Sequence, residues 1–182
     1  YTVFSLWDTY RAAHPLFTIT VPELVPDFIN TMLTIKDQQG KLPVWSLAGN
    51  ETNCMIGYHA VPVIADAVHK KITGFDYAKA LSASVHSASL DFRGLNHYRK
   101  YGYIPSELEN ESVAKTLEYA IDDWCISQMA GDMGNDDLSA SFRERSKFYR
   151  NVFDTTLLFV RGRMSDGSWR PDFDPLYSHH TN

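Results

Sequence analysis

Apolar residues recur along most of the chain at the spacing of helices. Between residues 22 and 39 they fall mostly three or four positions apart, which places them on one face of a helix. Gly40 is suited to end this helix, and Pro26 indicates that its regular part begins a turn after residue 22. The same reasoning predicts further helices over residues 53–72, 76–89 and 95–101, one beginning at Ser112, and one from Asp136 or Asp137 through Phe153. Pro62 should bend the second of these helices or mark its true start.

The helix that begins at Ser112 is apolar over more than one stripe, so we expect it to be buried on several sides. Buried helices that alternate with amphipathic ones, joined by long connections, are typical of a helical toroid. The connections over residues 13–20, 40–53 and 102–111 would gather at one mouth of such a toroid and carry its site. Residues 157–169 instead predict a hairpin or extended segment. The pattern therefore predicts an all-α fold, part of a helical barrel.

Composition narrows the class of protein. The chain has 182 residues, 44% of them apolar and 21% charged, which is typical of one globular domain. A formal charge of −5 argues against nucleic acid as the main partner, because phosphate binding needs a basic patch. No apolar stretch is long enough for a membrane span. The two cysteines are too few for a disulfide framework, and both are expected to be buried on apolar helical faces.

The first segment with candidate chemistry lies near the N-terminus. Trp7 offers a flat apolar face, Asp8 a carboxylate, and Arg11 a planar set of donors on the same side if the segment is helical. An aromatic platform beside charged groups suits the binding of a sugar. The alternative is structural, with Asp8 capping the helix and Trp7 packing against its first turn.

The second segment is a long loop that contains Trp45, Asn50 and Glu51. Glu51 could be an acid, a metal ligand or an acceptor for sugar hydroxyls. It could also be a solvated carboxylate near the start of the next helix, which Thr52 or Asn53 would cap. The loop also holds one of two N-glycosylation sequons, which begin at Asn50 and Asn110.

The third segment places Asp122, Asp123 and Trp124 in succession within an apolar helix. Two buried carboxylates are costly unless each is paired, so we expect one to point outward. The other needs a partner, either an arginine such as Arg11 or a ligand. Taken alone, this segment favours a structural ion pair.

Together these segments resemble glycoside hydrolase family 92, the calcium-dependent exo-acting α-mannosidases. The resemblance spans nearly the whole chain and rests on the following motifs, in order: Trp7-Asp8-Thr9-Tyr10-Arg11 with His14-Pro15-Leu16; Gly49-Asn50-Glu51-Thr52 with Gly57-Tyr58-His59; Lys115-Thr116-Leu117-Glu118-Tyr119-Ala120 with Asp122-Asp123-Trp124; and Arg161-Gly162-Arg163-Met164 with Phe173-Asp174-Pro175.

The resemblance implies an (α/α)6 catalytic domain, of which residues 1–182 are a part; we expect the β-sandwich domain that precedes it and the rest of the barrel to belong to a longer polypeptide. It implies removal of terminal α-linked mannose, most often α-1,2-linked, from mannosides or N-glycans, by an inverting reaction assisted by Ca²⁺. It also implies a secreted or periplasmic protein. The general acid would follow shortly after the segment matching Asp174-Pro175, and the base and most calcium ligands further on, so no catalyst or metal ligand is assigned in this chain.

The expected mannose-binding residues are Trp7, Asp8, Arg11, Trp45, Asn50 and Glu51. His14, Asp123 and Trp124 are expected to support them. Two alternatives remain at this point: Glu51 is itself catalytic, or the function is of another class. The other classes are a different (α/α)6 carbohydrate enzyme, such as a trehalase-like hydrolase, and a non-catalytic structural half-barrel.

Overall fold

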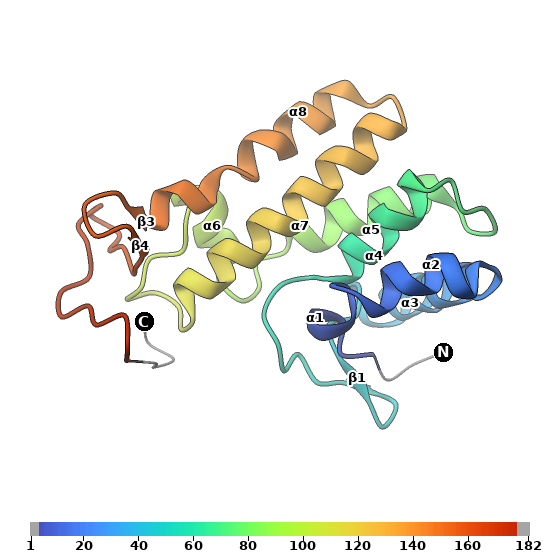
Figure 1. Ribbon diagram of the computed structural model, residues 1–182, viewed down its shortest axis with the longest axis horizontal. Coiled ribbons are helices and arrows are strands. Elements are labelled where there is room, and N and C mark those ends of the chain that lie inside the picture. The colour runs from blue at the N-terminus through green and yellow to red at the C-terminus, as the bar shows by residue number, and fades with distance from the viewer. Residues whose placement is uncertain (1–3, 178–182) are drawn as a thin grey trace.

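The computed structural model describes residues 4–177, and the chain folds almost entirely into helices (Figure 1). The helices are α1 (Leu6–Thr9), α2 (Ala13–Thr20), η1 (Pro22–Leu24), α3 (Val25–Gln39), α4 (Ala60–His69), α5 (Tyr77–Ser89), α6 (Leu95–Tyr101), α7 (Ser112–Asp132), α8 (Asp136–Arg145) and η2 (Phe148–Val152). The named strands of this part are two residues long: β1 (Ser46–Leu47), β2 (Asn50–Glu51), β3 (Phe153–Asp154) and β4 (Phe159–Val160). The predicted all-α class is confirmed.

Glycine and proline set several of the predicted helix ends. Gly40 ends α3 with φ +86°, and its N–H donates to Lys36 O at 2.8 Å. Pro22 begins a short 3-10 turn, and the regular α3 starts at Val25, as Pro26 indicated. Asp76 caps α5 by accepting a hydrogen bond from the N–H of Lys79 at 2.9 Å.

The predicted helix over residues 53–72 is too long at its N-terminal end. Residues 53–59 form an irregular connection instead, in which Asn53 has φ +50° and Gly57 has φ +80°, a conformation that no helix accommodates. Helix α4 begins only at Ala60, so Pro62 lies in its first turn, where a missing N–H costs nothing. Cys54 lies exposed in this connection, and the expectation that it is buried on a helix is wrong.

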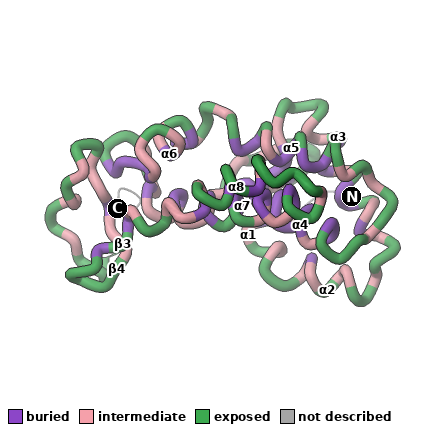
Figure 2. The backbone as a smooth tube through the Cα atoms, turned by 90° about the horizontal axis from the view of Figure 1, so that it is seen from above, coloured by how far each residue is buried: buried purple, intermediate pink, exposed green. Residues whose placement is uncertain are grey.

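Helix α7 is the centre of the fold. It packs against α4 and α5 on one side and against α8 and η2 on the other, and Figure 1 shows α8 running beside it. Its inward side chains, including Tyr119, Ile126 and Met129, are at most 2% exposed. Figure 2 shows the buried stretches concentrated where α4, α5 and α7 meet. The predicted burial of this helix is therefore confirmed on these two sides, whereas Ile121 and Trp124 on the same helix are exposed.

The end of the described chain departs from the helical pattern, as predicted. Helix α8 ends at Arg145, earlier than expected, and η2 leads into the antiparallel pair β3–β4, with Phe153 opposite Val160. Arg163 then pairs with Trp169 across a tight turn. In residues 4–177, no helix is both long enough and apolar enough to cross a lipid bilayer.

Candidate functional site

The carboxylate of Glu118, on α7, joins two of the predicted sugar-binding residues. Its Oε1 accepts a hydrogen bond from Trp7 Nε1 at 3.0 Å and another from Arg11 Nη2 at 3.2 Å. The Arg11 guanidinium also lies over the Trp7 ring, 4.6 Å from its centroid. The structure thus brings Trp7 and Arg11 together through a residue 111 positions away from Trp7 in the sequence.

A buried histidine lies behind Glu118. His59 Nε2 is 3.3 Å from Glu118 Oε2, and His59 Nδ1 is 2.7 Å from Asp122 Oδ1. Glu118 and Asp122 are four residues apart on α7, so both face the same neighbour. Tyr10 stacks on the imidazole with ring centroids 4.4 Å apart. We call Glu118, His59 and Asp122 the carboxylate–histidine cluster.

The electrostatics of this cluster favour a protonated imidazole. Burial by itself would lower the pKa of His59, but the carboxylates of Asp122 and Glu118 outweigh it and raise the pKa to about 9. For Glu118, burial acts to raise the pKa, whereas His59, Trp7 and Arg11 lower it below its usual value. For Asp122, burial raises the pKa above its usual value despite the opposing effect of His59. At neutral pH the protonated His59 therefore lies between Glu118 and Asp122.

Gly57 makes room for His59. At φ +80° it adopts a conformation that side chains rarely tolerate, and a Cβ there would lie 2.3 Å from His59 Nε2. The backbone of Tyr58 then donates its N–H to Asp122 Oδ2 at 2.8 Å. The irregular connection before α4 is thus shaped around the imidazole.

The predicted loop residues form a hairpin whose shape depends on Glu51. Burial acts to raise the pKa of Glu51, but its carboxylate accepts N–H groups from Asn53, Trp45 and Val44 at 2.7–3.0 Å, and the pKa is lowered. Asn50 is exposed, and its amide donates to Ala48 O. The alternative in which Glu51 is a solvated carboxylate is wrong, because its oxygens accept hydrogen bonds from the loop backbone. Its predicted role in sugar binding stays a prediction.

This loop supports the helix that carries Trp7. The N–H of Leu6, the first residue of α1, donates to Val44 O at 3.2 Å, and Ser5 pairs with Trp45. Backbone pairing therefore links the loop that Glu51 holds to helix α1, which carries Trp7.

Asp8 and His14 lie apart from the Glu118 contacts. Asp8 is exposed and accepts a hydrogen bond from the hydroxyl of Ser5 rather than pairing with Arg11. His14 is 3% exposed among phenylalanine rings, and burial lowers its pKa, which favours the neutral form. Their expected roles stay predictions.

The expectation that one of the two successive aspartates points outward is wrong. Asp122 and Asp123 are both 0% exposed, because α7 has protein on two sides and adjacent positions can each face an interior neighbour. Asp123 accepts hydrogen bonds from Tyr58 Oη at 2.6 Å and Arg145 Nε at 2.9 Å. Its partner is therefore Arg145 and not Arg11. Burial raises the pKa of Asp123 to about 6 despite the opposing effect of Arg145.

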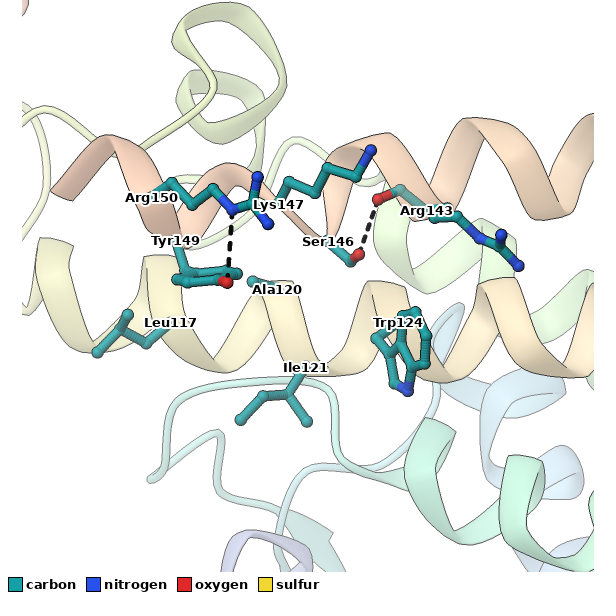
Figure 3. Close-up of a pocket in the computed structure, with 9 residues that line it drawn as sticks. All are labelled: Leu117, Ala120, Ile121, Trp124, Arg143, Ser146, Lys147, Tyr149 and Arg150. Carbon is teal, nitrogen blue, oxygen red and sulfur yellow. Dashed lines mark hydrogen bonds between the residues drawn. The ribbon is translucent and has the colours of Figure 1, made fainter. Parts of the chain in front are cut away.

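A groove of about 720 Å³ runs between α7 and the segment from α8 to η2 (Figure 3). Its apolar side chains include Leu117, Ile121 and Trp124 on α7, and Trp124 is 47% exposed there. Lys147 and Arg150 lie opposite, and no carboxylate lines the groove.

Comparison with known proteins identifies the family. The sequence model described as "Glycosyl hydrolase family 92 catalytic domain" matches residues 1–182. The chain belongs to glycoside hydrolase family 92. Its helices are accordingly part of the (α/α)6 barrel of that family.

Solved relatives agree with this assignment. A family 92 α-mannosidase from Bacteroides thetaiotaomicron, solved in complex with mannoimidazole, is 48% identical, with a TM-score of 0.94 over 96% of this chain. A family 92 inverting mannosidase from the same organism is 35% identical, with a TM-score of 0.88 over 94% of the chain. A curated relative from Arthroderma benhamiae, described as a secreted glycosidase, is 27% identical over 92% of the chain. The chain spans only 23–24% of the length of these relatives.

Sequence reasoning missed Glu118, His59 and Tyr10 as members of the candidate site. Glu118 and His59 fall within the family motifs, but nothing local in the sequence shows that they meet. The one available signal was the four-residue spacing of Glu118 and Asp122 on a helix expected to be buried. Within residues 4–177, no three His, Cys, Asp or Glu side chains gather in a way that could hold a metal ion.

Proposed function

We propose that this chain supplies part of the mannose-binding pocket of an exo-acting α-mannosidase. The observation that carries the proposal is the joining of Trp7, Arg11 and Glu118 into one cluster of aromatic and charged groups. It is supported by 48% identity to an α-mannosidase that was solved with mannoimidazole bound. The substrates we propose are terminal α-1,2-linked mannosides, including those of N-glycans.

The exposed groups near Glu118 are those that would meet the sugar. The Arg11 side chain is 46% exposed and presents guanidinium N–H donors, and the exposed Asp8 carboxylate lies one turn earlier in the chain. Charged donors and acceptors of this kind form stronger hydrogen bonds to hydroxyls than neutral groups do. Trp7 supplies an apolar ring to the same surface. We propose that Trp45 and Asn50 border the pocket, and that Glu51 shapes it by holding the loop.

We propose that the reaction inverts the anomeric configuration and that Ca²⁺ assists it. The described residues do not offer a calcium site, so its oxygen ligands, like the general acid and base, would come from other parts of the longer protein. When bound, the ion would hold mannose hydroxyls. Within this chain, we assign only binding and positioning roles.

Proton NMR of α-1,2-mannobiose hydrolysis by the full-length protein, with Ca²⁺ or with EDTA, tests this function. We expect β-mannose to appear first, and EDTA to abolish its release. If α-mannose appears first, the inverting mechanism is wrong. If mannobiose stays intact under both conditions, the proposed linkage or substrate is wrong. Turnover that EDTA leaves unchanged would refute the calcium requirement alone.

We propose that further helices of the same polypeptide cover the apolar groove on α7. Leu117, Ile121 and Trp124 recur at helical spacing and line the groove, and Ile121 and Trp124 are exposed. The relatives are about four times as long as this chain. A dye that fluoresces on apolar surfaces should therefore bind the isolated chain and not the full-length protein. Equal binding to both would contradict this proposal.

We further propose that the full-length protein is exported from the cytoplasm. The support is the curated relative described as a secreted glycosidase. Mannosidase activity should then be found in the medium or periplasm after cell fractionation, and its confinement to the cytoplasm would contradict the proposal.

A further inference from the structure

Glu118 lies behind the exposed groups that the proposed pocket presents. Its side chain is 13% exposed, whereas that of Arg11 is 46% exposed. We propose that Glu118 is a positioning residue, which fixes the orientation of Trp7 and Arg11 toward the sugar. This inference rests on the function proposed above and adds a role for a residue that would not itself touch the substrate.

The contacts of Arg11 show how its orientation is fixed. Its guanidinium lies 4.6 Å from the Trp7 ring centroid and 4.9 Å from that of Tyr10, and it donates to Glu118 Oε1 at 3.2 Å. Its Nε also donates to the backbone carbonyl of Trp7 at 3.2 Å. An unrestrained arginine would lose rotamer freedom on binding a ligand, at a cost to affinity. The Glu118 carboxylate removes that cost in advance.

The same oxygen of Glu118 also fixes Trp7. Because its Oε1 accepts the Trp7 indole N–H at 3.0 Å, the edge of the ring that faces Glu118 is set. One acceptor atom thus defines the relative placement of an aromatic platform and a cation. A sugar that packs on the Trp7 ring and accepts hydrogen bonds from Arg11 requires that placement.

Buried side chains in turn hold Glu118 in position. The buried His59 lies 3.3 Å from its Oε2 and is in turn bound to Asp122 at 2.7 Å. Asp122 also accepts the backbone N–H of Tyr58. The buried members of the carboxylate–histidine cluster therefore connect the interior of the fold to the proposed pocket.

Stabilising the fold is not the main effect of the Arg11–Glu118 pair. A pair with one partner half exposed contributes little to folding, because water screens the attraction. Its more direct consequence is to hold exposed donors in one place. If Glu118 positions Arg11, its loss should weaken ligand binding; if it only stabilises the fold, ligand affinity should not change.

A double-mutant cycle in the full-length protein tests the inference. The variants are Glu118→Gln, Arg11→Gln and the two combined, and the measurement is calorimetric binding of mannoimidazole. We expect each single substitution to weaken binding about tenfold, the effect of losing one charge-assisted hydrogen bond. Because Glu118 acts through Arg11, the double variant should bind far better than the hundredfold product of the two losses would give.

Two further variants keep the test decisive. Asp132→Asn is the matched control, because Asp132 also lies on α7 and also pairs with a histidine, His69, but at the exposed far end. It should bind as the wild type does. If Glu118→Gln does not fold, Glu118→Asp retains the charge but withdraws it from Trp7, and the same affinity loss is expected.

The failures of the inference and of the function are distinguishable. If Arg11→Gln weakens binding and Glu118→Gln does not, or if their losses simply multiply, Glu118 has no positioning role and the pocket stands. If the wild type neither binds mannoimidazole nor hydrolyses mannosides, the proposed function falls and the inference with it.

Discussion

The protonation of His59 makes the stability of this domain sensitive to alkaline pH. The pKa of His59 is about 9 in the folded protein, compared with an ordinary value of 6.5. Because folding raises the pKa, the stabilisation is fully present below pH 6.5 and is lost as the pH rises through 9. The difference between the two pKa values corresponds to about 3 kcal/mol of unfolding free energy. We expect most of that amount to disappear between pH 6.5 and pH 9.5.

Few neighbouring groups obscure this titration. Tyr10 stacks on the imidazole, but burial raises its pKa to about 12, so it stays protonated throughout the window. Glu118 has a lowered pKa, so it does not change its charge near pH 9. The loss of stability in that range should therefore follow His59 itself.

Histidine-selective NMR of the full-length protein gives the pKa directly, and denaturant unfolding at each pH gives the free energy. The Glu118→Gln substitution removes one of the two carboxylates, so it should lower the pKa of His59 and shift the loss of stability to lower pH. The Asp132→Asn control should leave the profile unchanged. A His59 pKa near or below 6.5 in the wild type would refute the reasoning, as would stability that is flat between pH 7 and 9.5.

Two further substitutions test local features of the site. Gly57→Ala should destabilise the domain by about 2–4 kcal/mol in denaturant unfolding, because the new Cβ displaces His59. The control Gly40→Ala has a similar φ but nothing within 4 Å of the new Cβ, so it should cost only about 1 kcal/mol. Equal losses would show that the contact with His59 is unimportant. Glu51→Gln should lower the free energy of unfolding by about 1–3 kcal/mol, because its amide cannot accept all the loop N–H groups, and should reduce kcat by less than about tenfold. A thousandfold loss of kcat at unchanged stability would instead make Glu51 catalytic.

The sequence predicts those helix ends that a single residue determines. Gly40 and Asp76 act within one turn of chain, so their effects can be read locally, and the bounds 95–101 were predicted as observed. The stretch before α4 was misread because its apolar residues continue the helical spacing. There the backbone instead follows the packing of Gly57 against His59, which depends on a contact in space.

Only the contacts between residues close in sequence could be predicted for the candidate site. Trp7 and Arg11 are close in sequence, so they could be grouped without any long-range contact, although α1 ends at Thr9 and Arg11 lies in the turn that follows it. Their common acceptor, Glu118, lies more than 100 positions away, and no local pattern indicates that it meets them. The partner of Asp123 was missed for the same reason, since Arg145 reaches it only because α8 packs beside α7.

Helix α7 carries three carboxylates within two turns, and each of them has a positively charged partner. Each carboxylate faces a different cation: Glu118 meets Arg11 at the pocket, Asp122 meets His59, and Asp123 meets Arg145 on α8. Asp122 and Asp123 are buried, and removing one partner of a buried pair leaves an uncompensated charge, which costs about 3–5 kcal/mol. An alternative packing of the helices around α7 would break several pairs at once. The two buried pairs therefore fix the position of α7 relative to the connection before α4 and to α8, on the helix that also presents Glu118 to Trp7.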